Sequence, residues 1–221
     1  MPKTINIKGV IIAHEDKWIY DSFQIENVSE KDVEAQLLEA NGGEVIVRIN
    51  SPGGDVFIGS EIYDLLASYG GKLQIRIVGM AASAASVIAC AGPSEIAPTA
   101  MMMIHNVQSR AEGDYRDMEH SAETLREANR SVMAAYRAKT KRSEEELLNL
   151  MDNTTYMSAD KAVELGFVDK ISDYEKQTPE SGVQLAAAMT GLLPVATIQK
   201  FRAERASAQA RLDLINLMEV K

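Results

Sequence analysis

The sequence predicts one α/β domain built on a largely parallel β-sheet, followed by a shorter tail. Three observations support this prediction. β-branched runs of strand length alternate with segments in which apolar residues recur every three or four positions. Turn sequences rich in glycine and proline separate several of these segments. The chain has 221 residues, which is an ordinary length for a single domain with a large core.

The expected elements alternate along the chain. Strands are predicted over residues 5–12, 44–50, 73–78 and 101–104, and helices over residues 29–38, 57–69, 83–91, 114–139, 143–151 and 158–165. Ser29 with Asp32, and Ser143 with Glu146, have the spacing of helix capping boxes. Strands separated by helices imply crossover connections and parallel pairing. Because ligands gather at the carboxyl ends of such strands, we expect the chemistry at residues 51–54, 79–83 and 105–106.

The long segment over residues 114–139 carries one apolar stripe among many charged residues. The stripe is interrupted by Asn129 and consists of Met118, Ala122, Leu125, Val132 and Tyr136. Such a helix either projects from the domain to contact a partner or covers the sheet, and the pattern leaves both open. From residue 175 the chain becomes polar and then helix-like at 198–218. We therefore expect a catalytic domain over residues 1–174 and a partly helical, mobile tail over residues 175–221.

The composition argues against several classes of function. A net charge of −9 disfavours nucleic acid as a partner, because phosphate binding needs clustered Lys and Arg. A single cysteine, Cys90, rules out a disulfide within the chain. The N-terminus lacks a signal-peptide pattern, and the most apolar segment, residues 75–92, is short and interrupted for a membrane span. We expect a cytoplasmic protein without a cofactor, a bound metal, or a nucleic-acid or membrane partner.

Three segments carry candidate chemistry. Ser83 follows a strand and is surrounded by small residues, which leave its hydroxyl uncrowded and let the amide of Ala84 face a developing oxyanion. Ser51-Pro52-Gly53-Gly54 can expose a second amide, because paired glycines adopt backbone angles closed to other residues. His105 ends a strand and could activate a serine. Each segment alone is equally well explained by an ordinary turn, a packed helix or a structural histidine.

Taken together and in order, these segments resemble the Clp protease proteolytic subunit family. The segments are Ser51-Pro52-Gly53-Gly54, Gly79-Met80-Ala81-Ala82-Ser83 and Met103-Ile104-His105. Residues 158–169 resemble the closing segment of that family, and the likeness covers roughly residues 5–171. The resemblance implies a spiral of ββα units, as in the related crotonase fold, with a projecting long helix. It also implies protein or peptide substrates and a homo-oligomeric ring or two stacked rings.

By this resemblance Ser83 is the nucleophile, His105 the general base, and the amides of Gly54 and Ala84 form the oxyanion hole. One departure concerns the acid. The family places it where this chain has Thr154, and the nearest aspartate is Asp152. We expect Asp152 to orient His105, with Thr154 or a backbone carbonyl as alternatives.

The two ends depart from the housekeeping enzyme as well, because little sequence precedes the first strand and a tail follows the domain. These departures resemble the Clp-related head maturation proteases of tailed bacteriophages and prophages, which would make a capsid or scaffold protein the partner. Three other readings stay open. They are a weakly active or inactive assembly protein with a protease fold, a crotonase-fold acyl-CoA enzyme, and a membrane-associated Ser/Lys peptidase, which lacks support because no anchor is evident.

Overall fold

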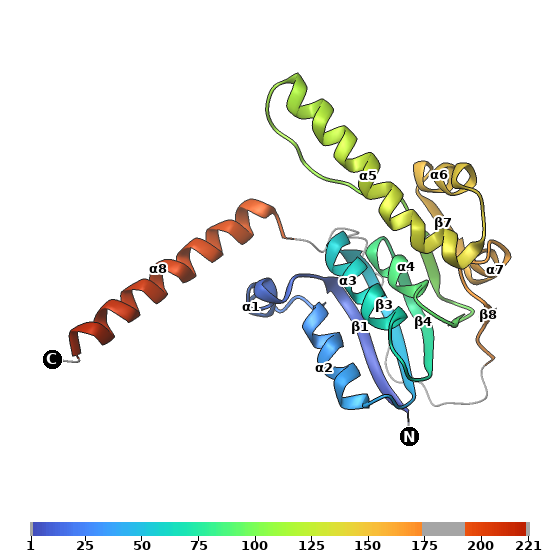
Figure 1. The fold of residues 1–221 in the computed structure, drawn as a ribbon, viewed down its shortest axis with the longest axis horizontal. Helices are drawn as coiled ribbons and strands as arrows, with labels where there is room; N and C mark the ends of the chain where they lie inside the picture. Colours follow the sequence, from blue (N-terminus) through green and yellow to red (C-terminus); the bar gives the residue numbers. More distant parts are fainter. Residues whose placement is uncertain (1, 174–192, 220–221) are drawn as a thin grey trace.

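A computed structural model describes residues 2–173 and 193–219 of the chain (Figure 1). The polar stretch after residue 173 and most of the apolar segment at 185–193, both part of the expected tail, lie outside the described residues. The described elements are β1 (Lys3–Ile11), a 3-10 turn η1 (His14–Asp16), α1 (Lys17–Ser22), β2 (Asn27–Val28), α2 (Glu30–Ala40), β3 (Val45–Gly54), α3 (Val56–Ala67), β4 (Leu73–Ala82), α4 (Ala84–Ala89), β5 (Ser94–Ile96), β6 (Met101–Ile104), α5 (Tyr115–Thr140), α6 (Glu144–Asp152), β7 (Thr155–Ser158), α7 (Ala159–Glu164), β8 (Lys170–Ile171) and α8 (Val195–Glu219).

The predicted α/β class is confirmed. Within the described residues one sheet runs in the order β2-β1-β3-β4-β5-β8, and all of these neighbours are parallel. The sheet divides at β4, because its first half pairs with β5 and its last residues pair with β6. The antiparallel pair β6–β7 departs from the expected parallel pattern. β7 was not predicted because its four residues lack the continuous apolar run that marks β6, and the two- or three-residue strands β2, β5 and β8 were not predicted either.

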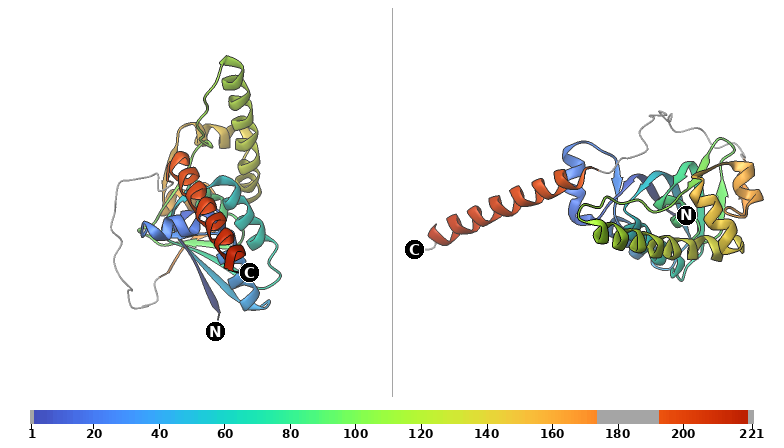
Figure 2. Two further views of the ribbon diagram at one scale, coloured as in Figure 1. Left: turned by 90° about the vertical axis from the view of Figure 1, so that its left-hand side faces the viewer. Right: turned by 90° about the horizontal axis from the view of Figure 1, so that it is seen from above.

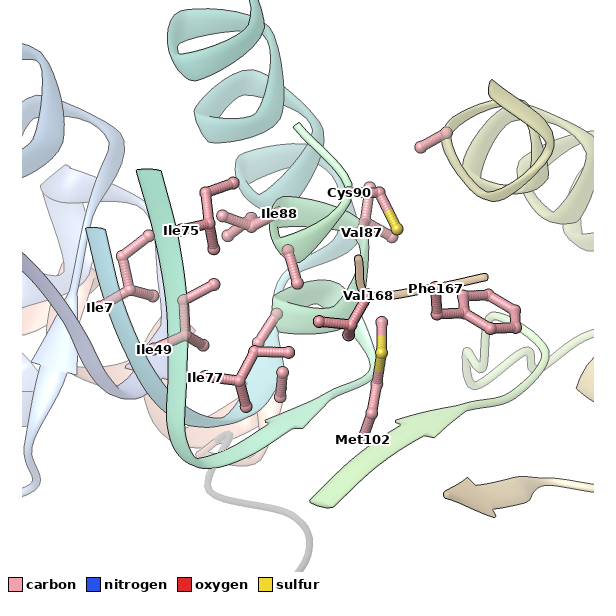
Figure 3. Packing of buried hydrophobic residues seen from close by; sticks show 14 of the residues in the cluster. Ile7, Ile49, Ile75, Ile77, Val87, Ile88, Cys90, Met102, Phe167 and Val168 are labelled. Carbon is pink, nitrogen blue, oxygen red and sulfur yellow. The ribbon is translucent and has the colours of Figure 1, made fainter. Parts of the chain in front are cut away.

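The core lies between the sheet and the helices α3 and α4 (Figures 1 and 3). Buried residues alternate along β3, as they must in a strand whose two faces differ. Figure 3 shows Ile49, Ile75 and Ile77 of the central strands packed toward Ile88 and Val87 of α4. Every residue of α4 is buried, which fixes the start of this helix at the end of β4.

Both interpretations of the long helix are partly correct. The second half of α5 packs on the core through Val132, Met133, Ala135 and Tyr136, which are buried. The first half projects beyond the sheet, and Figures 1 and 2 show it extending away from the other helices. Met118 in this half is 39% exposed. The stripe expected to contact a partner is therefore divided between the core and the projecting half.

The start of the tail helix is attached to the domain. Phe201 makes edge-on ring contacts with Trp18 and Phe23. Arg202 forms ion pairs with Glu15 and Asp16, at 2.6 and 2.7 Å. The described part of the tail thus begins in contact with α1 rather than apart from the domain, and the rest of α8 extends outward (Figures 1 and 2).

Candidate active site

Adjacent parallel strands bring Ser83 and His105 together. Ala82 at the end of β4 lies beside Met103 of β6, and the Ser83 amide donates to the Met103 carbonyl at 3.0 Å. Ser83 follows Ala82 directly, and His105 follows β6 directly, so both leave the sheet at the same edge. This is the edge at which the strand ends predicted the chemistry.

The backbone of Ser83 adopts a conformation that serines rarely take. Its φ is 54° and its ψ is −125°, at the junction of β4 with α4. Such a conformation costs roughly 1–3 kcal/mol and persists only where the surroundings hold it. The carbonyl of Ser83 accepts a hydrogen bond of 2.6 Å from the Ser86 hydroxyl. The sharp turn presents the Ser83 hydroxyl at the start of the helix.

The glycine loop lies against Ser83. A methyl group added at Gly53 would sit 2.7 Å from the Cβ of Ser83 and 2.6 Å from the carbonyl oxygen of Ala82. Gly53 also has a φ of +96°, which favours glycine. A methyl group at Gly54 would meet the Ile11 carbonyl oxygen at 2.1 Å. Both glycines are therefore needed for this backbone to pass between β1 and the serine.

The Ser83 hydroxyl and the imidazole of His105 form a direct hydrogen bond. The distance between Ser83 Oγ and His105 Nε2 is 2.8 Å. Burial lowers the pKa of His105 from its ordinary value of 6.5, because the charged ring loses water. The ring is consequently neutral at pH 7, and its Nε2 lone pair can take the hydroxyl proton.

The acid expected beside His105 lies elsewhere. Among the residues the structure describes, the Asp152 carboxylate accepts a hydrogen bond of 2.8 Å from the side-chain amide of Asn106, the residue after His105, and not from the ring itself. The predicted direct contact is thus not formed. Thr154 occupies the left-handed region with a φ of 47°, and its amide donates to the Met151 carbonyl. This local turn separates Asp152 from the family's position of the acid.

Four further residues form hydrogen bonds that lead to the pair, and the sequence assigned none of them a role of its own. They are Ser86, Asn106, Asn129 and Tyr136. Asn106 lies in the segment 105–106, where the strand ends predicted the chemistry, and Asn129 interrupts the apolar stripe that contains Tyr136. Ser86 resembles an ordinary helix residue in sequence.

Neither a metal site nor a membrane span emerges from residues 2–173 and 193–219. In that part of the chain no three His, Cys, Asp or Glu side chains are grouped so that they could hold an ion. The helices described there also lack the combination of length and apolar character that crossing a membrane requires. Cys90 is buried, and burial raises the pKa of its thiol to about 12, so it is not a nucleophile at neutral pH.

A serine hydroxyl that is hydrogen-bonded to a histidine ring at the carboxyl edge of a parallel sheet is the arrangement found in serine hydrolases. Residues 10–175 match the model of the Clp protease family. The chain therefore belongs to the Clp protease family, a family of serine proteases.

The curated relatives agree with this assignment. The chain is 33% identical over 171 residues to the ATP-dependent Clp protease proteolytic subunit 1 of Corynebacterium diphtheriae, covering 73% of this chain and 81% of that protein. It is 29% identical over 170 residues to the subunit 1 of Corynebacterium glutamicum, covering 73% and 82%. It is 28% identical over 169 residues to the corresponding subunit of Porphyromonas gingivalis, covering 73% and 76%. The likeness spans most of each relative.

Proposed function

We propose that this protein is a serine endopeptidase in which Ser83 is the nucleophile and His105 the general base. The observation that carries the proposal is the 2.8 Å hydrogen bond between Ser83 Oγ and His105 Nε2. A serine hydroxyl is a weak nucleophile unless an adjacent base removes its proton. The strained turn at Ser83 adds support, because strain of this kind clusters at active sites.

The reaction follows from the positions of these atoms. Ser83 Oγ attacks the carbonyl carbon of the scissile peptide bond, and His105 Nε2 takes the hydroxyl proton. The amides of Gly54 and Ala84 are proposed to stabilise the oxyanion. The imidazolium then gives its proton to the leaving amine as the carbon–nitrogen bond breaks. Water, activated by the same histidine, hydrolyses the acyl-enzyme and restores Ser83.

The substrate is proposed to be a capsid or scaffold protein processed during phage head assembly. The support is the helix α8, which lies beyond residues 10–175, the part of the chain that matches the Clp protease family, and which resembles the added segment of head maturation proteases. The same proposal places the protein in the cytoplasm and in a homo-oligomeric ring or two stacked rings. Co-expression with a capsid or scaffold protein tests it directly. Cleavage by the wild type and not by Ser83→Ala is expected, and an intact substrate with both would contradict this choice of substrate.

A fluorophosphonate probe tests the peptidase activity itself. We expect covalent labelling of Ser83 and loss of at least about 1000-fold in peptidase activity in both Ser83→Ala and His105→Ala, because triad members act as one unit. The double variant should be no worse than either single variant. Full activity in Ser83→Ala, or an unlabelled wild type that cleaves peptides, would contradict the proposal.

One observation favours a second function. In the described residues Asp152 contacts Asn106 and not His105, so the base lacks a direct carboxylate partner. A weakly active or inactive assembly protein would tolerate this arrangement. The crotonase-fold alternative gains no such support, since an acyl-CoA enzyme does not need the Ser83–His105 bond. Probe labelling separates the two remaining functions.

A further inference from the structure

We propose that the inner face of α5 is a common support for the nucleophile and the base, with Asn129 and Tyr136 as its positioning residues. The inference rests on the proposed function and concerns what holds Ser83 and His105 in place. Asn129 and Tyr136 are seven positions apart in α5, which is close to two helical turns. They therefore face the same side, separated by about 10 Å along the helix axis.

Asn129 holds the chain that follows His105. Its side-chain oxygen accepts a hydrogen bond of 2.7 Å from the Val107 amide. Its side-chain nitrogen donates to the Asn106 side-chain oxygen at 3.0 Å. The Asn106 nitrogen in turn donates to Asp152 at 2.8 Å. The two consecutive residues after His105 are thus tied to α5, and Asn106 also links this segment to Asp152 at the end of α6.

Tyr136 holds the nucleophile from the same face of α5. Its hydroxyl is 2.7 Å from the Ser86 hydroxyl, and Ser86 donates to the Ser83 carbonyl at 2.6 Å. Since the Ser86 proton is used on Ser83, the Tyr136 hydroxyl is the donor to Ser86. Tyr136 is fully buried and its ring packs edge-on against Phe167, so the position of its hydroxyl is fixed.

This support matters because Ser83 is strained and the ring of His105 has few contacts that orient it. Ser83 adopts a strained backbone conformation at the mouth of a short helix. His105 has, among the described residues, no carboxylate on its ring to set its orientation. A displacement of about 1 Å between reacting groups can cost a factor of about 100 in rate. One rigid helix that fixes both residues limits such displacement.

Three variants test the proposal. Asn129→Leu removes both side-chain bonds of Asn129 with little change in volume, Asn106→Ala removes the carboxamide that joins Asn129 to Asp152, and Tyr136→Phe removes only the hydroxyl. The matched control is Asn153→Ala, because Asn153 follows Asp152 and, among the described residues, its side chain bonds to Asn149 alone. The measurements are kcat and KM on a fluorogenic peptide, the rate of fluorophosphonate labelling, and the melting temperature.

We expect the three variants to lower kcat and the labelling rate together by about 10- to 100-fold, with KM within about twofold. Asn153→Ala should stay within about twofold in every rate. A purely structural role would lower the melting temperature while leaving kcat at the wild-type value well below it. That result in Asn129→Leu and Tyr136→Phe would overturn the proposal.

Magnetic resonance gives a readout that does not depend on activity. The chain has three histidines, so His14 and His120 serve as internal references for His105. Asn129→Leu and Asn106→Ala should shift the ring signals of His105 alone, and Tyr136→Phe should speed hydrogen exchange of the Ser83 amide. If the variants show these changes but the wild-type protein is neither labelled by the probe nor cleaves peptides, the proposed function fails and the support by α5 stands. Unchanged His105 signals and unchanged Ser83 exchange would overturn the support whatever the activity.

Discussion

At the scale of single residues, His105 combines a direct bond to Ser83 with a buried ring. The bond measures 2.8 Å, and burial is the cause of the lowered pKa. A carboxylate in contact with the ring would act in the opposite direction, since it favours the charged form. The pKa of His105 therefore shows whether a carboxylate contacts its ring.

The pH dependence of the peptidase reaction follows from this pKa. The base must be neutral, so kcat/KM should be constant at neutral pH and fall as pH drops through the pKa of His105, below 6.5. The same group favours the folded state above pH 6.5 and loses that contribution as pH falls through its lowered pKa. A pH–rate profile checks this, and an acid limb centred above pH 7 would indicate a carboxylate on the ring.

Thr154 provides a second prediction at this scale. A β-branched residue in the left-handed region is strained by roughly 1–2 kcal/mol, and asparagine tolerates this region better. Thr154→Asn should therefore raise the free energy of unfolding by about 1 kcal/mol without lowering kcat. Denaturant unfolding and peptide hydrolysis check both parts. A large loss of activity in this variant would instead assign Thr154 to the orientation of His105.

At the scale of elements, the glycine loop at the end of β3 and the first turns of α8 both depend on close contacts. The loop packs against Ser83, and α8 packs against α1. Neither contact is made by residues that are neighbours in sequence. Each can be tested by one substitution that affects its own element.

Gly53→Ala should abolish peptidase activity. The new methyl group would meet backbone and the Ser83 Cβ at less than 3 Å, so the loop or the serine must move. Gly42→Ala is the control, because a methyl group there would meet nothing within 4 Å although its φ is also positive, at +74°. The peptide assay and circular dichroism compare the two variants. Equal activity in both would show that the loop does not constrain Ser83.

The contact of α8 with α1 can be followed through the single tryptophan. Trp18 contacts the ring of Phe201 and lies under the guanidinium of Arg205. Phe201→Ala should expose Trp18 and shift its fluorescence to longer wavelength, at a cost of about 1 kcal/mol in this contact. Leu38→Ala, far from Trp18 in sequence and 72% exposed, is the control. An unchanged spectrum in Phe201→Ala would mean that α8 does not rest on α1 in solution.

At the scale of the whole molecule, the projecting half of α5 leaves apolar side chains uncovered in a lone protomer. Tyr115 is 70% exposed and Met118 39% exposed in this half. Val132 and Tyr136, from the same sequence stripe, are already buried in the core of the protomer. Only Met118, Ala122 and Leu125 of the stripe are therefore free to contribute to an interface between copies.

The proposed ring should depend on this half of α5. Met118→Asp combined with Ala122→Glu should yield smaller species and reduced activity while the domain stays folded, because charge placed in an apolar interface loses its water. Thr124→Glu on the same helix, an exposed position outside the stripe, is the control. Size-exclusion chromatography with light scattering gives the mass. A wild type that is monomeric at micromolar concentration and fully active would contradict the ring.

The sequence by itself predicted the α/β class, most of the helices and four of the eight described strands in their order, two of the three described capping boxes, and Ser83 and His105 as the candidate catalytic pair. These features depend on local signals: apolar periodicity, caps at fixed spacing, and motifs at the ends of strands. Only the tertiary structure decided that Asp152 bonds to Asn106, that Asn129 and Tyr136 face the site, and that α8 rests on α1. Those contacts join residues far apart in the chain, and a polar side chain in sequence does not reveal which partner the fold will bring within hydrogen-bond distance.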